Sequence, residues 1–366
     1  SFSNRLAMAR LSSAIVLAAL VRGALAATGD VGLCSASETA EEVASAFNLS
    51  GKVVIVTGGD SGLGYATAAT MAKKGATVII ATHNLAKGER AAQTITNTTG
   101  GIAYGYLMDL ASFASVRAFA QKFIEDFKGK LDILFNNAGI LGLSLTMSGH
   151  FSDTLTKDGF EIVFQVNYLG HFLLSELLLP ALRSSGGRIV HTSSIAHKIA
   201  CHWAGLPDNC LKDWTNIPPS PLSGHRSGFL PKTLYGVSKM MQILHAQELA
   251  VRESASGVTA FSLCPGFVST GMAPQGPAWF EKAMDALTCA GMEPLHQKVC
   301  PYSPQQGAAV VVSVGLQAQA NHSGAWYTRY SGCQPAEIEM NGFEPAMRHV
   351  LYDKSLEWVG LRRSNG

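Results

Sequence analysis

Residues 52–64 read Lys-Val-Val-Ile-Val-Thr-Gly-Gly-Asp-Ser-Gly-Leu-Gly, and this stretch decides the fold of the chain. Residues 53–56 form an apolar, β-branched run that predicts a buried strand. The glycines after it predict a tight turn, and alanines and a methionine follow over residues 66–72 at largely helical spacing. A strand, a glycine-rich turn and a helix in this order are typical of a dinucleotide pyrophosphate site, although alone they leave an ordinary strand-to-helix connection equally open.

Three glycines carry the binding hypothesis. Gly58, Gly62 and Gly64 let the backbone turn sharply, bring amide N–H groups close to phosphate oxygens and allow the helix to pack closely on the strand. The N-terminus of the helix adds a partial positive charge. The turn is therefore predicted to hold a dinucleotide.

Composition limits the class of protein. Of the 366 residues, 47% are hydrophobic and 15% are charged, and no linker or repeat divides the chain, so one main α/β domain is expected. The net charge is +2 and the basic residues are scattered, so we expect no nucleic-acid partner. No uninterrupted apolar run reaches the roughly 18 residues of a membrane span, so no stable membrane span is expected.

The N-terminus has a different character. Arg5 and Arg10 precede an apolar run over residues 11–21, and Ala24-Leu25-Ala26 follows. Residues 1–26 therefore resemble a cleaved signal peptide, which favours the secretory pathway or an endomembrane lumen. An uncleaved signal anchor and an organelle-targeting leader stay open. Residues 27–48 are predicted to be a poorly ordered lead-in.

The cysteines fit an oxidising compartment. Six of the seven lie in the lead-in or in segments predicted to be loops, whereas Cys264 ends an apolar strand. Glycosylation sequons at Asn48, Asn97 and Asn321 are compatible with the same compartment.

The end of the second strand bears on the cofactor. This strand is predicted over residues 76–82, and an acidic residue at its end would bind the ribose 2′-hydroxyl of NAD. His83 stands there instead, with Lys87 and Arg90 shortly after it. The sequence therefore favours NADP and leaves NAD open.

Strands and helices alternate through the rest of the chain. We expect helices over residues 86–97, 112–127, 160–183, 235–252, 304–317 and 335–359, and strands over 102–108, 131–135, 188–192, 258–263 and 325–330. A long loop over 195–232 and a lid over 271–303 interrupt them. Asp109, after the third strand, suits either an adenine contact or a helix N-cap, and Asn167 suits either a structural or a functional polar group.

The motifs, taken together and in order, resemble the short-chain dehydrogenase/reductase family over residues 49–361. The resemblance is carried by Thr57-Gly58-x-x-x-Gly62-x-Gly64, Asn136-Asn137-Ala138-Gly139, Asn167, Ser194, Tyr235-x-x-x-Lys239, Pro265-Gly266 and Thr270. The retinol dehydrogenase and WW-domain oxidoreductase branch is the most similar, without WW domains, through Gly170-His171-Phe172-Leu173-Leu174, Ser193-Ser194-x-Ala196-His197 and Ser303-Pro304-x-x-Gly307-Ala308. It implies a single domain with a Rossmann-type, doubly wound parallel sheet of about seven strands.

The resemblance also implies the chemistry. A hydride would pass between nicotinamide and a hydrophobic alcohol or carbonyl such as a retinoid, a steroid or a lipid aldehyde. Tyr235 would be the acid/base. Lys239, together with an oxidised nicotinamide, would lower the pKa of Tyr235, and it would also bind the nicotinamide ribose. Ser194 would bind the substrate oxygen, and Asn167 would hold a water that links Lys239 to solvent. The implied cofactor contacts are Thr57, Gly58, Asp60, Ser61, Gly62, Leu63, Gly64, His83, Asp109, Leu110, Asn137, Ala138, Gly139, Tyr235, Lys239, Pro265, Gly266, Val268 and Thr270.

Several features depart from the family pattern or leave alternatives. His83 replaces a usual Arg, Cys264 replaces a usual His, and the interval from Ser194 to Tyr235 is unusually long. The long loop contains residues that could ligate zinc, form a disulfide or remain free thiols, and no metal is predicted. The four residues in question are His197, Cys201, His202 and Cys210.

Other properties are less determined by the sequence. Aromatic residues near the expected substrate side motivate the hydrophobic substrate, namely Phe151, Trp203, Trp214, Phe229 and Trp279. A homo-oligomer stays open. The alternative function is a cofactor-binding scaffold or redox sensor without turnover.

Overall fold

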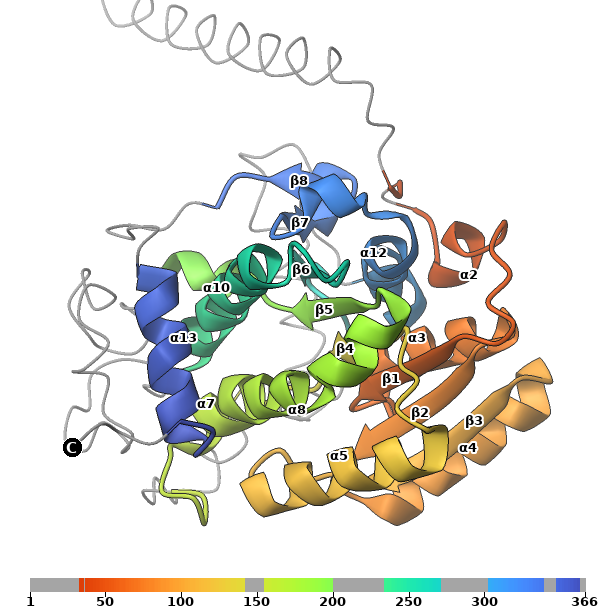
Figure 1. Cartoon of the computed structure of the whole chain (residues 1–366). Coiled ribbons are helices and arrows are strands. Elements are labelled where there is room, and N and C mark those ends of the chain that lie inside the picture. The colour runs from red at the N-terminus through yellow and green to blue at the C-terminus, as the bar shows by residue number, and fades with distance from the viewer. Residues whose placement is uncertain are drawn as a thin grey trace, which may run out of the picture. The chain divides into compact units, whose positions relative to one another are not determined.

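A single sheet organises the molecule, with its strands in the order β3-β2-β1-β4-β5-β6-β7-β8 (Figure 1). The computed structural model describes residues 33–35, 37–141, 155–199, 234–270, 302–338 and 347–362. The strands are β1 (Val53–Thr57), β2 (Thr77–Thr82), β3 (Ile102–Leu107), β4 (Ile133–Asn136), β5 (Arg188–Thr192), β6 (Thr259–Cys264), β7 (Trp326–Thr328) and β8 (Gln334–Ala336). Neighbouring strands pair in parallel from β3 to β7, and β8 is antiparallel to β7.

The helices connect the strands and cover the sheet. The described α-helices are α2 (Ala40–Val43), α3 (Gly62–Lys73), α4 (Leu85–Thr99), α5 (Phe113–Phe127), α7 (Ile162–Phe164), α8 (Gly170–Ser185), α10 (Tyr235–Arg252), α12 (Pro304–Gln317) and α13 (Met347–Trp358). A π-helical segment, η1 (Gln165–Leu169), joins α7 to α8, and short 3-10 helices are η2 (Ile195–Ile199), η5 (Ala320–His322) and η6 (Arg329–Ser331). The predicted alternation of strands and helices, and the doubly wound α/β class, are confirmed.

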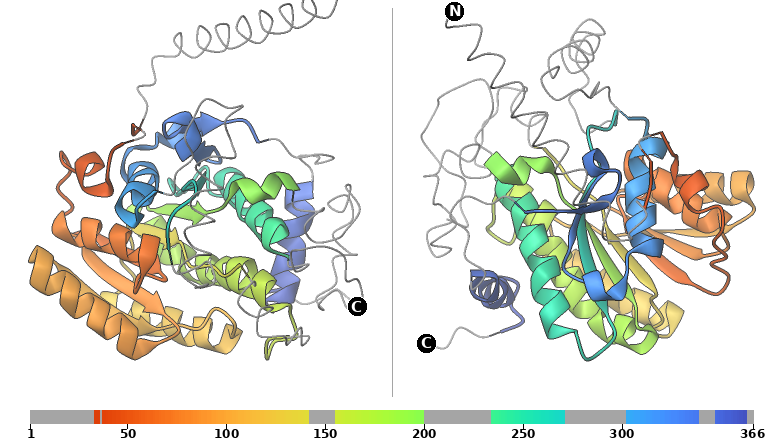
Figure 2. Two further views of the ribbon diagram at one scale, coloured as in Figure 1. Left: turned by 180° about the vertical axis from the view of Figure 1, so that it is seen from behind. Right: turned by 90° about the horizontal axis from the view of Figure 1, so that it is seen from above.

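Two hydrophobic cores lie on opposite faces of the sheet. In β1, Val54 and Val56 pack with residues of α2, α3, α4 and α12, whereas Val53 and Ile55 pack with residues of α5, α8, α10 and α13. The view from above in Figure 2 shows the sheet between these two helix layers. Burial on both faces explains why the first strand is a continuous apolar run.

The predicted helix over 160–183 is one helical rod with a π-helical turn in it, formed by α7, η1 and α8. Its stretch Ile162–Ser185 is, among the described residues, the one helix long and apolar enough to cross a membrane, with 78% of its most apolar window buried inside the fold. Burial of this extent is typical of a core helix.

The C-terminal part differs from the prediction in two ways. Residues 334–336, at the start of the expected terminal helix, form the edge strand β8, so the sheet has eight described strands rather than about seven. These residues pair with β7 instead, and Pro335 is tolerated there because an edge strand does not need every N–H in a ladder hydrogen bond. The terminal helix begins at Met347 instead.

The predicted poorly ordered lead-in is wrong from residue 33 onward. Ala40 and Val43 of α2 are buried, and Thr39 caps this helix through a capping box with Glu42. A disulfide joins Cys34 to Cys333, 299 residues apart. The start of the described chain is thus tied to the segment between β7 and β8, and these parts lie near each other in Figure 1. Apolar burial and the cross-link give this segment an order that its composition did not indicate.

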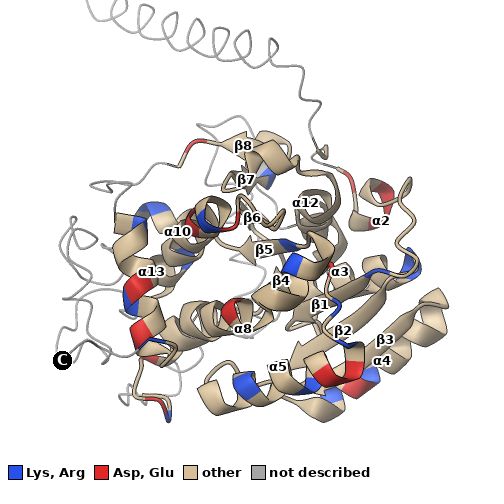
Figure 3. Cartoon of the chain, in the orientation of Figure 1, with Lys and Arg blue, Asp and Glu red and all other residues tan. Residues whose placement is uncertain are grey.

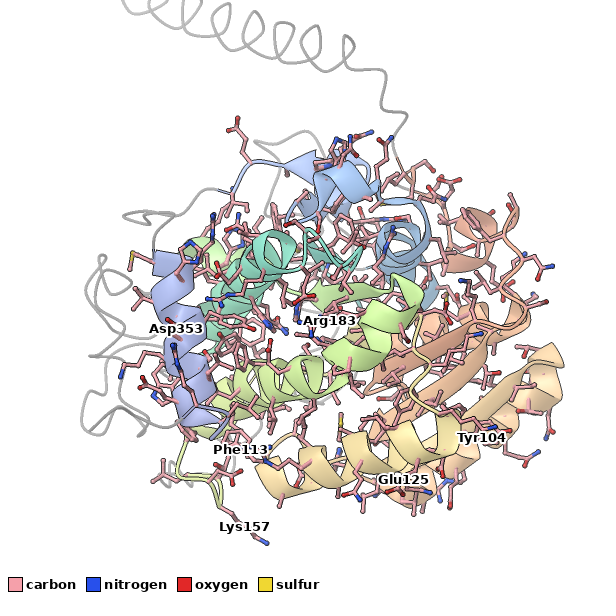
Figure 4. All side chains as sticks on the ribbon, in the orientation of Figure 1. Tyr104, Phe113, Glu125, Lys157, Arg183 and Asp353 are labelled. Carbon is pink, nitrogen blue, oxygen red and sulfur yellow. A yellow bond between two sulfur atoms is a disulfide. The ribbon has the colours of Figure 1, made fainter. Side chains whose placement is uncertain are left out.

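Charged side chains of both signs are interspersed over the elements in the view of Figure 3. Arg183 at the end of α8, labelled in Figure 4, pairs with Glu253 after α10, with 2.6 Å between Nη2 and Oε1. The predicted signal peptide over 1–26, the lid over 271–301 and residues 200–232 of the long loop lie outside the described residues.

Candidate active site

The candidate site lies along one edge of the sheet, where the parallel strands end. The residues at these carboxyl ends are Thr57, Thr82, Leu107, Asn136, Thr192 and Cys264. The strand order changes direction between β1 and β4, and ligands of open α/β sheets bind at such a point. The glycine-rich turn, Asn137 to Gly139, Ser194 and residues 265–270 each follow one of these strand ends.

Hydrogen bonds of Thr57 fix the segment after β4. The Oγ1 atom of Thr57 accepts the main-chain N–H groups of Asn137 and Ala138, each over 2.9 Å, and the Nδ2 atom of Asn137 donates to the Thr57 carbonyl over 3.0 Å. Thr57, Asn137 and Ala138 are therefore brought together as predicted. The contacts join the ends of β1 and β4 at the point where the strand order reverses.

A buried histidine orients the Thr57 hydroxyl. His171 Nδ1 lies 3.0 Å from the Asn167 carbonyl, which can only accept, so Nδ1 carries the proton. Burial lowers the pKa of His171 to about 3, so the ring is neutral and Nε2 accepts from Thr57 Oγ1 over 2.9 Å. Both lone pairs of the threonine oxygen are then left for Asn137 and Ala138.

The glycine-rich turn needs its glycines. Gly58 and Gly62 have φ values of +64° and +52°, in the left-handed region that favours glycine. A Cβ atom at Gly64 would lie 2.2 Å from the Gly58 carbonyl oxygen and 2.6 Å from Asn137 Nδ2. Leu63 is half-buried, Asp60 is half-buried and Ser61 is exposed. Gly64 thus permits the close packing of α3 on β1 that the sequence predicted.

The segment after β6 faces this turn. A Cβ atom at Gly62 would lie 3.2 Å from Thr270 Cγ2, which places Thr270 against the turn. Val268 pairs with Tyr302 in an isolated parallel bridge, and Gly266 has a φ of +80°. Pro265 is half-buried at the start of this segment. The structure therefore brings the segments 58–64 and 265–270 together.

Tyr235 and Ser194 form the polar pair expected at the reacting oxygen. Tyr235 begins α10, and its hydroxyl hydrogen bonds with the Ser194 side chain. Burial raises the pKa of Tyr235 to about 12, and the bond with Ser194 opposes that rise. Ser194 Oγ also accepts the N–H of Ala196 over 3.2 Å, which holds it in place.

Lys239 lies one helical turn after Tyr235. Its Nζ is 5.6 Å from the centroid of the Tyr235 ring, and it donates to the carbonyl of Thr192 over 2.7 Å. Burial lowers the pKa of Lys239 to about 7. The expected lowering of the Tyr235 pKa is therefore not produced by the described side chains, because desolvation of both groups dominates.

Asn167 holds a loop through its side chain. Its Oδ1 accepts the N–H of Ile140 over 2.8 Å, and its Nδ2 donates to the Ile140 carbonyl over 3.0 Å and to Ser238 Oγ over 3.2 Å. The amide of Asn167 is thus fully used in the structure. Asn167 therefore has a structural role in holding the loop that begins after Gly139, and its predicted functional role stays a prediction.

Gln242 stands between Lys239 and Asn167, where the sequence placed a water. Its Oε1 accepts from Lys239 Nζ over 3.2 Å, and its Nε2 donates to the main-chain carbonyl of Asn167 over 2.8 Å. Sequence reasoning missed Gln242 and the role of His171. Helical spacing was the available signal for Gln242, because residues three apart share a face.

The expected adenine side lies at the ends of β2 and β3. His83 is exposed directly after β2, and Asn84 caps α4 by accepting the N–H of Lys87 over 3.1 Å. Ser112, not Asp109, is the N-cap of α5, while Asp109 Oδ1 accepts the N–H of Ala111 over 2.9 Å. The N-cap alternative for Asp109 is therefore wrong, because a residue nearer the helix takes that position.

Leu110 has a packing role beside this edge. It is buried, and a Cβ atom at Gly170 would lie 2.7 Å from its carbonyl oxygen. Leu110 thus lies against the start of α8. The cofactor contact predicted for it stays a prediction.

The described residues contain no group of three or more His, Cys, Asp or Glu side chains that could hold a metal ion. His197 Nδ1 donates to the Ser194 carbonyl over 2.7 Å, and its ring packs against Trp326 with centroids 4.9 Å apart. Cys201, His202 and Cys210 lie outside the described residues.

The residues at this edge fit a dinucleotide. A Cβ atom at Gly139 would lie 3.4 Å from Lys239 Nζ and 3.3 Å from Asn167 Oδ1, so Gly139 packs beside these two polar atoms. The buried Oδ1 of Asn137, within the described residues, has no hydrogen-bond partner. The turn at residues 58–64 leads into the N-terminus of α3, and phosphate binding is favoured at a helix N-terminus.

Comparison with known proteins agrees with this geometry. The chain matches the family model for short chain dehydrogenase over residues 52–205. It is 33% identical to human retinol dehydrogenase 11 over 325 residues, which cover 87% of this chain and 88% of the relative. The chain belongs to the short-chain dehydrogenase family. The resemblance seen in the sequence motifs is thus confirmed.

Other relatives of this short-chain dehydrogenase extend the comparison. Mouse retinol dehydrogenase 12 is 39% identical over 220 residues, which are 60% of this chain and 62% of the relative, so this match spans less than two thirds of that protein. An uncharacterised protein from Mycobacterium paratuberculosis has a solved structure with 26% identity and a TM-score of 0.60, covering 89% of this chain and 97% of that one. The family and its retinol dehydrogenase members support an NAD(P)-dependent oxidoreductase.

A more distant solved structure shares the fold. L-sorbose reductase from Gluconobacter frateurii, solved with NADPH and L-sorbose, has 20% identity and a TM-score of 0.56, and the match covers 77% of this chain and 96% of that one.

Proposed function

We propose that this short-chain dehydrogenase transfers a hydride between NADP(H) and a hydrophobic alcohol or carbonyl, with Tyr235 as acid/base. The observation that carries the proposal is the convergence of Tyr235, Ser194 and Lys239 at the carboxyl ends of β5 and β6, with Gly139 beside Lys239 Nζ. A nicotinamide would supply or accept the hydride. The protein would move the proton and hold the oxygen.

Proton transfer is assigned to Tyr235. Its hydroxyl hydrogen bonds with Ser194, so both groups can contact one substrate oxygen. Lys239 would bind the ribose hydroxyls through the side of Nζ that faces Gly139, and its charge would favour the phenolate. Thr270, held against the turn at Gly62, would contact the carboxamide.

The preference for NADP is part of the proposal. His83 is exposed at the end of β2, and no carboxylate stands at that position. A 2′-phosphate is therefore not repelled there by a negative side chain. Lys87 and Arg90 follow in α4 and would attract it. Dissociation constants for NADPH and NADH at equal salt test this preference.

A charge variant makes the cofactor test sharper. His83→Asp places a carboxylate where it binds a ribose 2′-hydroxyl and repels a 2′-phosphate, so the preference should move toward NADH. Asn97→Asp adds the same charge to an exposed position at the other end of α4 and should leave the ratio unchanged. Tighter binding of NADH by the unmodified chain would contradict the NADP preference.

The substrate class rests on the retinol dehydrogenase relatives and on an apolar cluster beside the acid/base. Val163, Ala196 and Tyr235 form this cluster, with Ile140 and Leu141 packed against it. Activity of the purified chain should be screened on retinoids, steroids and lipid aldehydes with each cofactor. A chain that binds cofactor but turns over none of these substrates would favour the non-catalytic scaffold or redox sensor.

We also propose a secretory or endomembrane location. The Cys34–Cys333 disulfide supports it, because disulfides persist in oxidising compartments. N-terminal sequencing of the native protein should find a start near Ala27, and retention of Met8 would contradict cleavage of a signal peptide.

A further inference from the structure

Gln242 is completely buried and links two parts of the site that the sequence had joined through water. Lys239 and Gln242 are three residues apart on α10, so they share a face of that helix. Lys239 Nζ donates to Gln242 Oε1 over 3.2 Å, and Gln242 Nε2 donates to the Asn167 carbonyl over 2.8 Å. A side chain therefore makes a continuous connection from the ammonium to η1.

The orientation of the Gln242 amide follows from its partners. The Asn167 carbonyl can only accept a hydrogen bond and the Lys239 ammonium can only donate one. A flipped amide would place its NH2 group against the ammonium and its oxygen against the carbonyl. The observed orientation is the one in which both ends of the side chain are satisfied.

The Asn167 carbonyl is itself held in place. It also accepts from His171 Nδ1 over 3.0 Å, and Asn167 lies in the π-helical segment η1, a type of segment that often marks functional sites. His171 in turn supports Thr57 at the switch between β1 and β4. Gln242 is thus anchored to the same framework that shapes the cofactor edge.

The groups around Lys239 show why the neutral side-chain amide of Gln242 matters for the Lys239 ammonium. The titratable groups facing Lys239 in the described residues are Tyr235 on α10, Cys264 at the end of β6, His171 on α8 and His191 on β5. Burial keeps both histidines neutral by lowering their pKa values, and it raises the pKa of the Cys264 thiol. The ammonium is therefore supported by two acceptors, the Thr192 carbonyl and Gln242 Oε1.

We infer that Gln242 is a positioning residue that holds the Lys239 ammonium toward the cofactor edge and keeps it protonated around neutral pH. The inference rests on the proposed role of Lys239 in binding the nicotinamide ribose. Removal of one acceptor from a buried ammonium favours its neutral form. The neutral amine has lost the charge that Tyr235 needs.

Two substitutions at Gln242 should shift the pKa of Lys239 in opposite directions. Gln242→Met keeps the length of the side chain and removes both polar ends, so Lys239 should lose its proton at lower pH. Gln242→Glu is nearly isosteric and places a carboxylate against the ammonium, so Lys239 should keep its proton to higher pH. A role limited to packing would not give shifts of opposite sign.

A matched control is available in Gln165. This residue is also completely buried and donates from Nε2 to Asp158 Oδ2 over 2.6 Å, without a hydrogen bond to Lys239. Gln165→Met removes a buried amide in the same way. It should lower stability without changing the titration of Lys239.

The experiment is a titration of NADPH and NADH into the full chain between pH 6 and 9, followed by fluorescence. In the unmodified chain, affinity should fall as Lys239 loses its proton. The midpoint of that fall should move down by about one pH unit in Gln242→Met and up in Gln242→Glu. It should not move in Gln165→Met.

The outcomes separate this inference from the proposed function. Unchanged midpoints in both Gln242 variants, or an equal shift in Gln165→Met, would overturn the role of Gln242. Failure of the unmodified chain to bind either dinucleotide at any pH would instead overturn the proposed function. If Gln242→Met does not fold, Gln242→Leu, which also removes both polar ends, takes its place, and an unmoved midpoint in that variant would overturn the role of Gln242.

Discussion

Lys239 donates a hydrogen bond from its Nζ to the main-chain carbonyl of Thr192, with 2.7 Å between the two atoms. Thr192 ends β5, and Ser194, the partner of Tyr235, comes two residues later. The contact therefore fixes the ammonium relative to the strand that carries the serine. It also makes Lys239 a buried cation whose protonation is coupled to folding.

The stability of the chain should rise with pH above neutrality because of Lys239. Burial lowers its pKa from 10.5 to about 7, so between these values the unfolded chain binds the proton and the folded chain does not. Folding is thus favoured as pH rises through this window. Lys239→Met should flatten the rise in the urea midpoint between pH 7 and 9.5.

The control for this pH dependence is Lys87→Met, which changes an exposed lysine in α4. It should keep the slope of the unmodified chain. Equal slopes in Lys239→Met and in the unmodified chain would show that the pKa of Lys239 is not depressed.

Gly64→Ala should destabilise the fold and weaken dinucleotide binding. The new Cβ would lie 2.2 Å from the Gly58 carbonyl oxygen and 2.6 Å from Asn137 Nδ2, so α3 must move away from β1. Overpacking of this kind costs roughly 1–3 kcal/mol of the free energy of unfolding. Urea denaturation and NADPH titration measure the two effects.

Gly100→Ala is the matched comparison for Gly64. Gly100 has a φ of +72° and no atom within 4 Å of an added Cβ, so the substitution costs only backbone strain, about 1 kcal/mol. It should leave the affinity for NADPH unchanged. Normal affinity in Gly64→Ala would contradict the predicted packing of the turn.

The Cys34–Cys333 disulfide should contribute to stability. It closes a loop of almost the whole domain, and Arg329 Nη1 lies 3.0 Å from Cys34 Sγ, so Cys34→Ser also disturbs a buried arginine. A loss of about 2–4 kcal/mol in the free energy of unfolding is expected. Dithiothreitol should lower the urea midpoint of the unmodified chain more than that of Cys34→Ser.

The sequence predicted most of the fold because the relevant patterns are local. Local apolar and β-branched patterns predicted all seven parallel strands, β1 to β7, and the spacing of Tyr235 and Lys239 placed both on one face of α10. The short strand β8 escaped notice because three residues carry no periodicity. The order of residues 33–48 also escaped, since it depends on Cys333 and on packing against α12, both distant in sequence.

Within the site, the sequence identified the residues expected to contact cofactor and substrate, but it did not identify the buried side chains that hold them in place. Thr57 and Asn137 follow strand ends, a position that sequence can identify. His171 lies inside a helix, where a buried polar residue is recognised only from its partners across the fold. Gln242 was missed although it lies three residues from Lys239 on the same helix face. Burial raises the pKa of Tyr235 in the structure, and the predicted lowering by Lys239 together with an oxidised nicotinamide stays a prediction.

Turnover by Tyr235→Phe tests the central claim most directly. The substitution keeps the ring and its packing and removes the hydroxyl that hydrogen bonds with Ser194. Turnover of any substrate found by the screen should fall by about two orders of magnitude or more, while NADPH affinity stays near that of the unmodified chain. Near-normal turnover in Tyr235→Phe would contradict the assignment of Tyr235 as the acid/base.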